Sequence, residues 1–513
     1  MGGKQQCDDI GAYLMGISSR MMMRGLIFGL SILILSCTAV SSGVAVPPLQ
    51  KGDSSYTIPK EKMMRIKAAD LTIQVDPNFA YYKNRSVESI ADELYLAGYK
   101  AVHYFVVNEH NVNGPLIDAI RKRGLMVWLM TLGNGTYSTD RYPAGWEAWK
   151  MRVNSPTGEA SGFTFLTPFH PDFVAWKKKQ LVRLMKTYAF DGIELAESYF
   201  PEWDAIRLRT YGDVGPLAAQ AFLDRYGVRM PDFQDRDSPD YYLKQPDRYK
   251  KWIDFRVEII NGFLDDLING KDGIREARPD ALVATWSLAI DKGEQSFSKI
   301  REYQGLDAAK MIERVKPDLH YFQTHWPDWI KSESELPPDY MKHYQAFVDQ
   351  VRRVHPHVPL GLQADIGSIQ SMVKSKDWID KFNQHAREYG YVTWTSYEYH
   401  LGGHIYHEPL LVKECTRQGE SEIRIAFNKR IDPAAITEGQ LSILTEEGLF
   451  PLEGAKLTVD GHWLILKRTD WPSDGFELRV NNVKDTPQWW LFKSYPANEI
   501  AKDTRVKVLP ASE

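Results

Sequence analysis

The sequence predicts an α/β protein, a (β/α)8 TIM barrel followed by a small all-β sandwich. From Met64 onward, apolar runs of strand length alternate with amphipathic helical runs, which argues for a parallel sheet. Eight such strands over about 350 residues fit a single barrel. After His407 the pattern changes to an alternation with period two, which is typical of antiparallel strands. The 513 residues, 43% of them hydrophobic, are ample for a large core.

The N-terminal residues predict export. Residues 21–37 have a basic start and an apolar run of roughly a dozen residues, too short to span a bilayer comfortably. The end of this run, residues 34–37, resembles a bacterial lipobox, and that resemblance implies a lipid anchor at Cys37. Plain secretion after Ala39 or Ala45 is the alternative. With only Cys415 left beyond the signal, no intrachain disulfide is expected.

The chain divides into an export segment (1–45), a linker rich in Pro, Gly and Ser (46–62), the barrel (63–410), the sandwich (411–490) and a C-terminal tail (491–513). The predicted barrel strands are 65–75, 101–108, 126–132, 192–197, 282–287, 319–323, 360–364 and 392–397. Residues 89–98 are typical of the helices between them. A doubly wound sheet is disfavoured because no Gly-rich loop follows the first strand.

Two long segments interrupt the alternation, 133–170 and 199–246. They carry Trp146, Trp149 and Trp203. Because long loops in compact domains are usually binding loops or disordered, we expect these segments to form substrate walls.

In the C-terminal region, turns at residues 460–461 and 474–475 separate short alternating strands. Residues 425–437 resemble the start of the bacterial Ig-like module found in surface-layer proteins. The resemblance implies an accessory or spacer module.

The first catalytic candidate is Glu197, where the fourth predicted strand emerges. Barrel chemistry lies at the C-terminal ends of the strands, so an acid there is a catalytic candidate. Glycosidic hydrolysis needs a second carboxyl, and Asp365 and Glu398 follow the seventh and eighth strands. Glu194 is either a hydrogen-bonded core acid or part of the site.

Aromatic and histidine residues near other strand ends are candidates for binding sugar rings and hydroxyls. With Glu194, the predicted binding residues are Trp203, Trp286, His320, His325, Trp326, Trp394 and His400. A metal site at His320 and His325 is disfavoured because their spacing points them to opposite faces. There is no nucleophile elbow, phosphate loop, His-Glu-x-x-His or paired-cysteine motif, so no cofactor is predicted. The net charge of -4, with acids and bases interspersed, gives no reason to expect nucleic acid as a partner.

Residues 190–201 are similar to the Asp-Gly-Ile-His-Phe-Asp-Asp-Tyr-x-Tyr-Pro stretch of the hypothetical glycosyl-hydrolase-like barrel families of bacterial envelope proteins. Glu197 falls on the second acid of the Asp-Asp pair, and Ala196 replaces the first. A chitinase-type signature also begins Asp-Gly-x-Asp-x-Asp, but Ala196 again replaces an acid. The resemblance implies an exported glycoside hydrolase with a carbohydrate substrate. The missing acid favours the alternative, a noncatalytic glycan-binding envelope protein.

Overall fold

The computed structural model describes residues 57–154, 163–201, 210–398, 404–445 and 448–510. The predicted export segment, most of the predicted linker, Trp203 and His400 lie outside these ranges. Within the described residues, no helix combines the length and the apolar character needed to cross a membrane.

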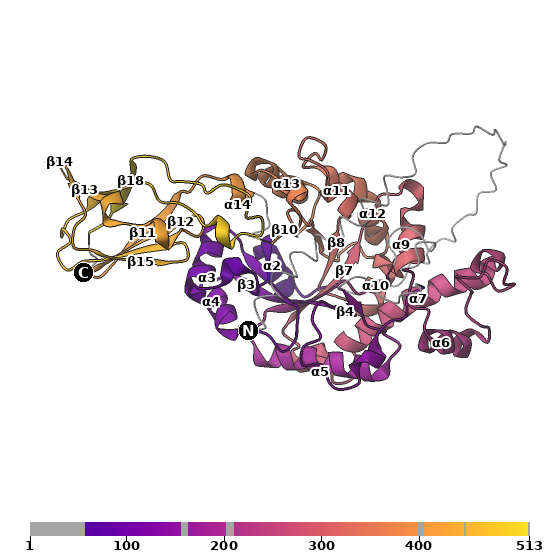
Figure 1. The fold of residues 1–513 in the computed structure, drawn as a ribbon. Coiled ribbons are helices and arrows are strands. Elements are labelled where there is room, and N and C mark those ends of the chain that lie inside the picture. The colour runs from indigo at the N-terminus through magenta and orange to yellow at the C-terminus, as the bar shows by residue number, and fades with distance from the viewer. Residues whose placement is uncertain (1–56, 155–162, 202–209, 399–403, 446–447, 511–513) are drawn as a thin grey trace.

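Eight parallel strands close into a barrel in the order β1-β10-β9-β8-β7-β6-β3-β2. The barrel is drawn in Figure 1. They are β1 Leu71–Val75, β2 Ala101–Val106, β3 Met126–Leu132, β6 Gly192–Ala196, β7 Leu282–Leu288, β8 Leu319–Gln323, β9 Leu360–Gln363 and β10 Thr393–Glu398. Each lies where the sequence predicted a strand, because each is a run of apolar or β-branched residues bounded by polar ones. The predicted (β/α)8 barrel is confirmed.

The first predicted strand began too early. Residues 65–68 belong to helix α2, Lys60–Ala68, which starts inside the predicted linker. Charged residues dominate this helix, and Ile66 is its buried residue. Lys62 makes an ion pair with Asp318 at 2.9 Å, which ties α2 to the barrel.

Large side chains fill the barrel interior and two glycines make room for them. A Cβ at Gly192 would lie 2.6 Å from the Trp128 ring, and one at Gly361 would lie 2.3 Å from the Tyr321 ring. The interior is therefore packed below the mouth, which is the edge of the barrel where the carboxyl ends of the strands emerge.

Helices surround the barrel (Figure 1). They are α3 Val87–Leu96, α4 Gly114–Lys122, α5 Pro171–Thr187, α7 Pro246–Ile268, α8 Ile274–Ala277, α9 Ser296–Gln304, α10 Ala308–Val315, α12 Gln345–Val354 and α13 Lys376–Glu388. Two shorter helices, α11 Trp326–Trp329 and α14 His404–His407, lie in loops that follow β8 and β10.

In the first long segment, β4 Gly135–Thr136 pairs antiparallel with β5 Thr164–Phe165, and a 3-10 turn carries Trp149. Trp149 is buried, and its ring centroid lies 5.4 Å from that of Trp176 on α5. Its aromatic surface is therefore used in packing rather than as an open wall.

The second long segment builds a subdomain of its own. Helix α6, Pro216–Tyr226, packs on α7 around a core that includes Phe222 and Trp252. This core is separate from that of the barrel.

The C-terminal region consists of two four-stranded antiparallel sheets. One is β11 Val412–Gln418, β12 Glu422–Phe427, β16 Trp463–Lys467 and β15 Lys456–Asp460; the other is β14 Gly448–Pro451, β13 Leu441–Thr445, β17 Phe476–Val480 and β18 Thr504–Val508. Buried residues from both sheets form one core. The predicted all-β domain is confirmed, but β18 lies in the predicted tail, where its residues complete the second sheet. The Ig-like and surface-layer resemblance stays a prediction.

Candidate active site

Glu197 lies directly after β6 and has a left-handed backbone. Its φ is 48°, which is uncommon for a residue other than glycine. The Gly133 amide donates to the Ala196 carbonyl at 2.8 Å. Backbone strain of this kind persists only where the surroundings hold it, and it occurs often at functional sites.

The loop after β3 supplies that support. Asn134 donates from Nδ2 to the Tyr199 carbonyl at 3.0 Å and accepts from the Tyr199 amide at 3.0 Å. Gly133 allows this close approach, because a Cβ there would lie 1.8 Å from Ser198 Oγ. The backbone on both sides of Glu197 is thus bound to the neighbouring strand end.

Asp365 lies two residues after β9 ends, on the same edge of the barrel. Ser368 Oγ donates to Asp365 Oδ2 at 2.6 Å. The other oxygen, Oδ1, is buried and has no hydrogen-bond partner among the described residues. An unpaired buried acceptor is costly when it is ionised, and it is available to a ligand that can donate a hydrogen bond.

The two carboxyls are electrostatically perturbed. Burial raises the pKa of Glu197 to about 7, and the charge of Asp365 acts in the same direction. Burial also raises the pKa of Asp365 to about 7, against the hydrogen bonds from Ser368. Near neutral pH a pair of this kind holds about one proton, so one carboxyl can donate a proton while the other carries charge.

Glu194 belongs to a buried network inside the barrel. Its Oε1 accepts from Gln363 Nε2 at 2.7 Å, and its Oε2 lies 2.6 Å from His103 Nδ1. His103 Nε2 lies 3.2 Å from the Tyr321 hydroxyl. Glu194 is fully buried inside the barrel beneath the mouth. A part for it in the site stays a prediction.

Trp286 also supports the mouth from below. It is 1% exposed, its Nε1 donates to Gln323 Oε1 at 3.1 Å, and its ring stacks on Tyr199 at 6.1 Å. His325 is buried at the start of α11, and Trp326 beside it is partly exposed. Trp326 keeps open surface, as does Trp146 in the first long segment.

Two predicted binding residues point away from the mouth. His320 is buried, with Nδ1 2.8 Å from Thr285 Oγ1 and Nε2 2.9 Å from Ser287 Oγ, and burial lowers its pKa to about 3. Because Tyr321 faces the interior, its strand neighbour His320 must face the outer layer. Trp394 is buried too, with the Arg387 guanidinium of α13 5.2 Å from its ring centroid. The structure does not bring these two residues to the carboxyls.

Glu398 ends β10, where its backbone pairs with Gln74 of β1. Its side chain lies outside the described structure, as do Trp203 and His400. The predicted site is thus represented by Glu197 and Asp365 at the mouth, with Trp286, His325 and Trp326 on the adjoining strand ends.

Sequence reasoning missed Asp76, which directly follows β1. It is 3% exposed, and burial raises its pKa to about 6 despite hydrogen bonds from Asn78 to Oδ1. The rule that selected Glu197, an acid directly after a buried strand, would also have selected this residue.

Glu109, which follows β2, makes a buried ion pair with Lys177 at 2.5 Å and so serves the structure.

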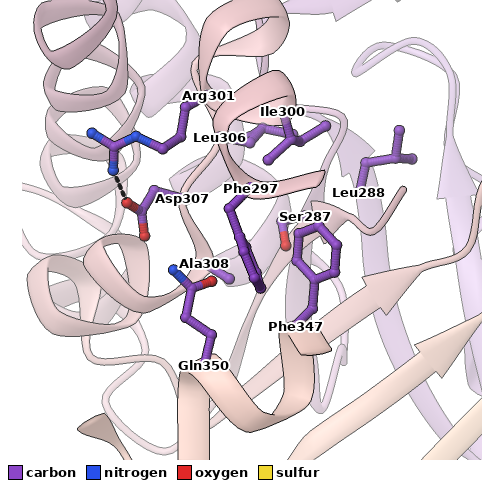
Figure 2. Close-up of a pocket in the computed structure, with 10 residues that line it drawn as sticks. All are labelled: Ser287, Leu288, Phe297, Ile300, Arg301, Leu306, Asp307, Ala308, Phe347 and Gln350. Carbon is purple, nitrogen blue, oxygen red and sulfur yellow. Dashed lines mark hydrogen bonds and ion pairs between the residues drawn. The ribbon is translucent and has the colours of Figure 1, made fainter. Parts of the chain in front are cut away.

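A small, partly open cavity lies between the barrel wall and the surrounding helices. It is lined by residues from the end of β7 and from α9, α10 and α12, beside the ion pair of Arg301 and Asp307 (Figure 2). Its volume of about 10 Å³ is enough for roughly one water molecule, so it is too small for a sugar.

Among the described residues, no cluster of His, Cys, Asp and Glu could hold a metal ion.

Fold and site together define a (β/α)8 barrel with two perturbed carboxyls at its mouth. No family model and no curated protein matches the chain. Similar solved structures include the glycoside hydrolase domain of PgaB (BpsB) from Bordetella bronchiseptica, at 16% identity and a TM-score of 0.48 over 66% of this chain and 96% of that one. A beta-galactosidase from Rahnella sp. R3 is similar at 12% identity and a TM-score of 0.46, over 66% of this chain and 52% of that one. The glycoside hydrolase domain of PelA from Pseudomonas aeruginosa has 10% identity and a TM-score of 0.33, over 65% and 96%. Likeness at this level concerns the fold alone.

Proposed function

We propose that this chain is a glycoside hydrolase that uses Glu197 and Asp365 as its two carboxyls. The observation that carries the proposal is the pair itself. Both acids emerge at one edge of the barrel, and both have a pKa raised to about 7, that of Glu197 partly by the charge of Asp365. Strongly perturbed acids in such a position are candidates for catalysis.

Glycosidic cleavage requires a proton for the leaving oxygen and a charged carboxylate on the other side of the bond. In the proposal, protonated Glu197 gives its proton to the glycosidic oxygen as the bond to the sugar carbon breaks. Ionised Asp365 then acts as nucleophile or activates the water that completes hydrolysis. Asp365 is taken as the partner because its charge acts on Glu197 and raises the pKa of that carboxyl. Glu398 stays the other candidate for the second carboxyl. Partly exposed Trp326 supplies a stacking surface for a sugar ring.

We also propose that the protein is exported, with or without a lipid anchor at Cys37. The support is the basic and apolar pattern of residues 21–37. Carbohydrate polymers lie mainly outside the cytoplasm, so the proposed export of the protein is consistent with the proposed substrate.

The test is reducing-end release from a panel of plant, algal and bacterial-wall polysaccharides. The protein from residue 46 onward is compared with its Glu197→Gln and Asp365→Asn variants. We expect one polysaccharide class to be cleaved, with kcat/KM lower by 10²–10⁴ in Glu197→Gln, the usual contribution of a positioned general acid. The matched control is Glu61→Gln, an exposed change at the start of α2.

Activity that survives within about tenfold in Glu197→Gln removes that residue from the mechanism. If neither wild type nor variant releases product but one glycan raises the melting temperature of both, the protein is the noncatalytic glycan-binding protein that Ala196 favours.

A further inference from the structure

The C-terminal sandwich contacts the segments that follow three neighbouring barrel strands. Strands β1, β10 and β9 are neighbours in the closed sheet, and the loop that follows each of them touches the sandwich or the chain segment after β17. In Figure 1 the sandwich lies against the side of the barrel that carries α3 and α14. Loops that follow barrel strands all lie on the catalytic face, so this contact reaches the rim of the mouth.

Arg430 makes the densest of these contacts, on the loop after β1. It is 5% exposed. Its guanidinium donates to the carbonyls of Tyr81 at 2.9 Å, Lys83 at 2.8 Å and Asn84 at 3.4 Å. Its backbone amide donates to the Tyr81 hydroxyl at 3.2 Å. A rigid guanidinium fork on three carbonyls between residues 81 and 84 fixes the path of that loop, which begins at Asp76.

The hairpin of β15 and β16 holds the other end of the same loop. The Ser86 amide donates to Asp460 Oδ1 at 2.8 Å, and Ser89 Oγ donates to the Asp460 carbonyl at 2.9 Å. Gly461, with φ of 60°, brings the hairpin so close that a Cβ there would lie 2.2 Å from Arg85 Nε. The sequence between Asp76 and α3 is therefore bound by the sandwich at both Arg430 and Asp460.

The two other loops are bound less densely. Lys429 Nζ donates to the carbonyls of Ile405 at 2.8 Å and Glu408 at 2.6 Å, after β10. Gln370, in the loop that carries Asp365, donates from Nε2 to Ser494 Oγ at 3.4 Å. The sandwich thus borders the side of the mouth to which Asp365 belongs.

We propose that the sandwich is part of the catalytic unit, and that Arg430 is a positioning residue that holds loop 76–86 in place at the rim of the mouth. This departs from the spacer role that the sequence implied. The predicted effect of Arg430 on turnover rests on the proposed hydrolase function. The binding of loop 76–86 by Arg430, called the clamp below, does not depend on that function.

The experiment uses the full chain with Arg430→Met and the milder Arg430→Lys. Hydrogen exchange is followed for the amides of residues 79–86, with Ser86 as the direct reporter of the Asp460 contact. We expect exchange there to rise at least tenfold in Arg430→Met and less in Arg430→Lys, while the barrel strands keep their protection. The matched control is Arg417→Met, since Arg417 donates to the Pro472 carbonyl within the sandwich.

On the polysaccharide that wild type cleaves, KM should rise severalfold in Arg430→Met with a smaller change in kcat, and Arg417→Met should match wild type. Exchange at 79–86 within twofold of wild type in both Arg430 variants overturns the clamp. A released loop with unchanged KM and kcat overturns the positioning role. If no glycan is hydrolysed, the proposed function fails, and the exchange measurement still decides whether the clamp exists.

Discussion

Two glutamates three residues apart, one on β6 and one directly after it, have opposite environments. Glu194 lies inside the barrel, with His103 on one carboxylate oxygen and Gln363 on the other. Glu197 lies just beyond the strand, partly buried, and no hydrogen-bond donor contacts its carboxylate among the described residues. Among the described residues, the charge that acts on it is that of Asp365, which repels its ionised form.

The comparison shows how the same side chain becomes structural or reactive. A buried carboxylate is stable when each oxygen has a donor, and such a network then makes the core rigid. A partly buried carboxyl without donors keeps its proton to higher pH, which suits a general acid but lowers the stability of the folded protein when the proton is lost. Three predictions test this difference, beginning with the largest effect.

The first compares Glu194→Gln with Glu197→Gln in chemical unfolding of the chain at pH 8. An amide has one acceptor oxygen where a carboxylate has two, so Glu194→Gln leaves His103 or Gln363 facing an N–H. We expect a loss of roughly 1–3 kcal/mol of unfolding free energy. At pH 8 the Glu197 carboxyl is ionised but has no hydrogen-bond donor. Glu197→Gln removes this charge, so the free energy of unfolding of the variant should equal or exceed that of wild type. A larger loss in Glu197→Gln than in Glu194→Gln would reverse the assignment of the two residues.

The second prediction concerns the support of Glu197. Asn134→Ala removes both hydrogen bonds to the Tyr199 backbone and frees the segment that holds Glu197 in its left-handed conformation. Since small displacements of a catalytic group are costly, kcat should fall by about 10- to 100-fold with KM little changed. Asn269→Ala serves as the control, because Asn269 donates to the Val315 carbonyl after α7, away from the mouth. A kcat within twofold of wild type would show that Asn134 does not position the acid.

The third prediction is the pH dependence of stability. The folded pKa values of Glu197 and Asp365, each about 7, lie above their ordinary values, so the stability from their protonated forms is complete below about pH 4. It is lost as pH rises through 7. Between pH 6 and 8, wild type should therefore lose about 2–3 kcal/mol relative to the double variant Glu197→Gln/Asp365→Asn, as measured by denaturant unfolding. If the unfolding free energies of wild type and the double variant change with pH in parallel, the pKa values of the two carboxyls are not raised.

Several parts of the site were predictable from local pattern. An acid directly after a buried strand lies at the edge of the barrel where the carboxyl ends of the strands emerge, and Glu197 and Asp365 were selected as candidates in that way. Asp76 satisfies the same rule, so its omission was avoidable. Asn134 could not be found, because its partner Tyr199 is 65 residues away and no local pattern connects them.

The direction of individual side chains was harder to predict. His320 and Trp394 lie on predicted strands, yet a shift of one residue in register decides whether a side chain faces the interior or the helices. Only the interior position of Tyr321 settles that His320 faces outward.

Hydrophobic periodicity therefore decided the eight strands, their order along the chain and the change to antiparallel structure after His407, because these depend on neighbours within one element. Tertiary structure alone decided that Glu194 is paired while Glu197 is not, that β18 completes the second sheet, and that Arg430 reaches the loop after β1. Each of those facts depends on atoms brought together from distant parts of the chain. The burial that shifts a pKa exists only once those parts have packed.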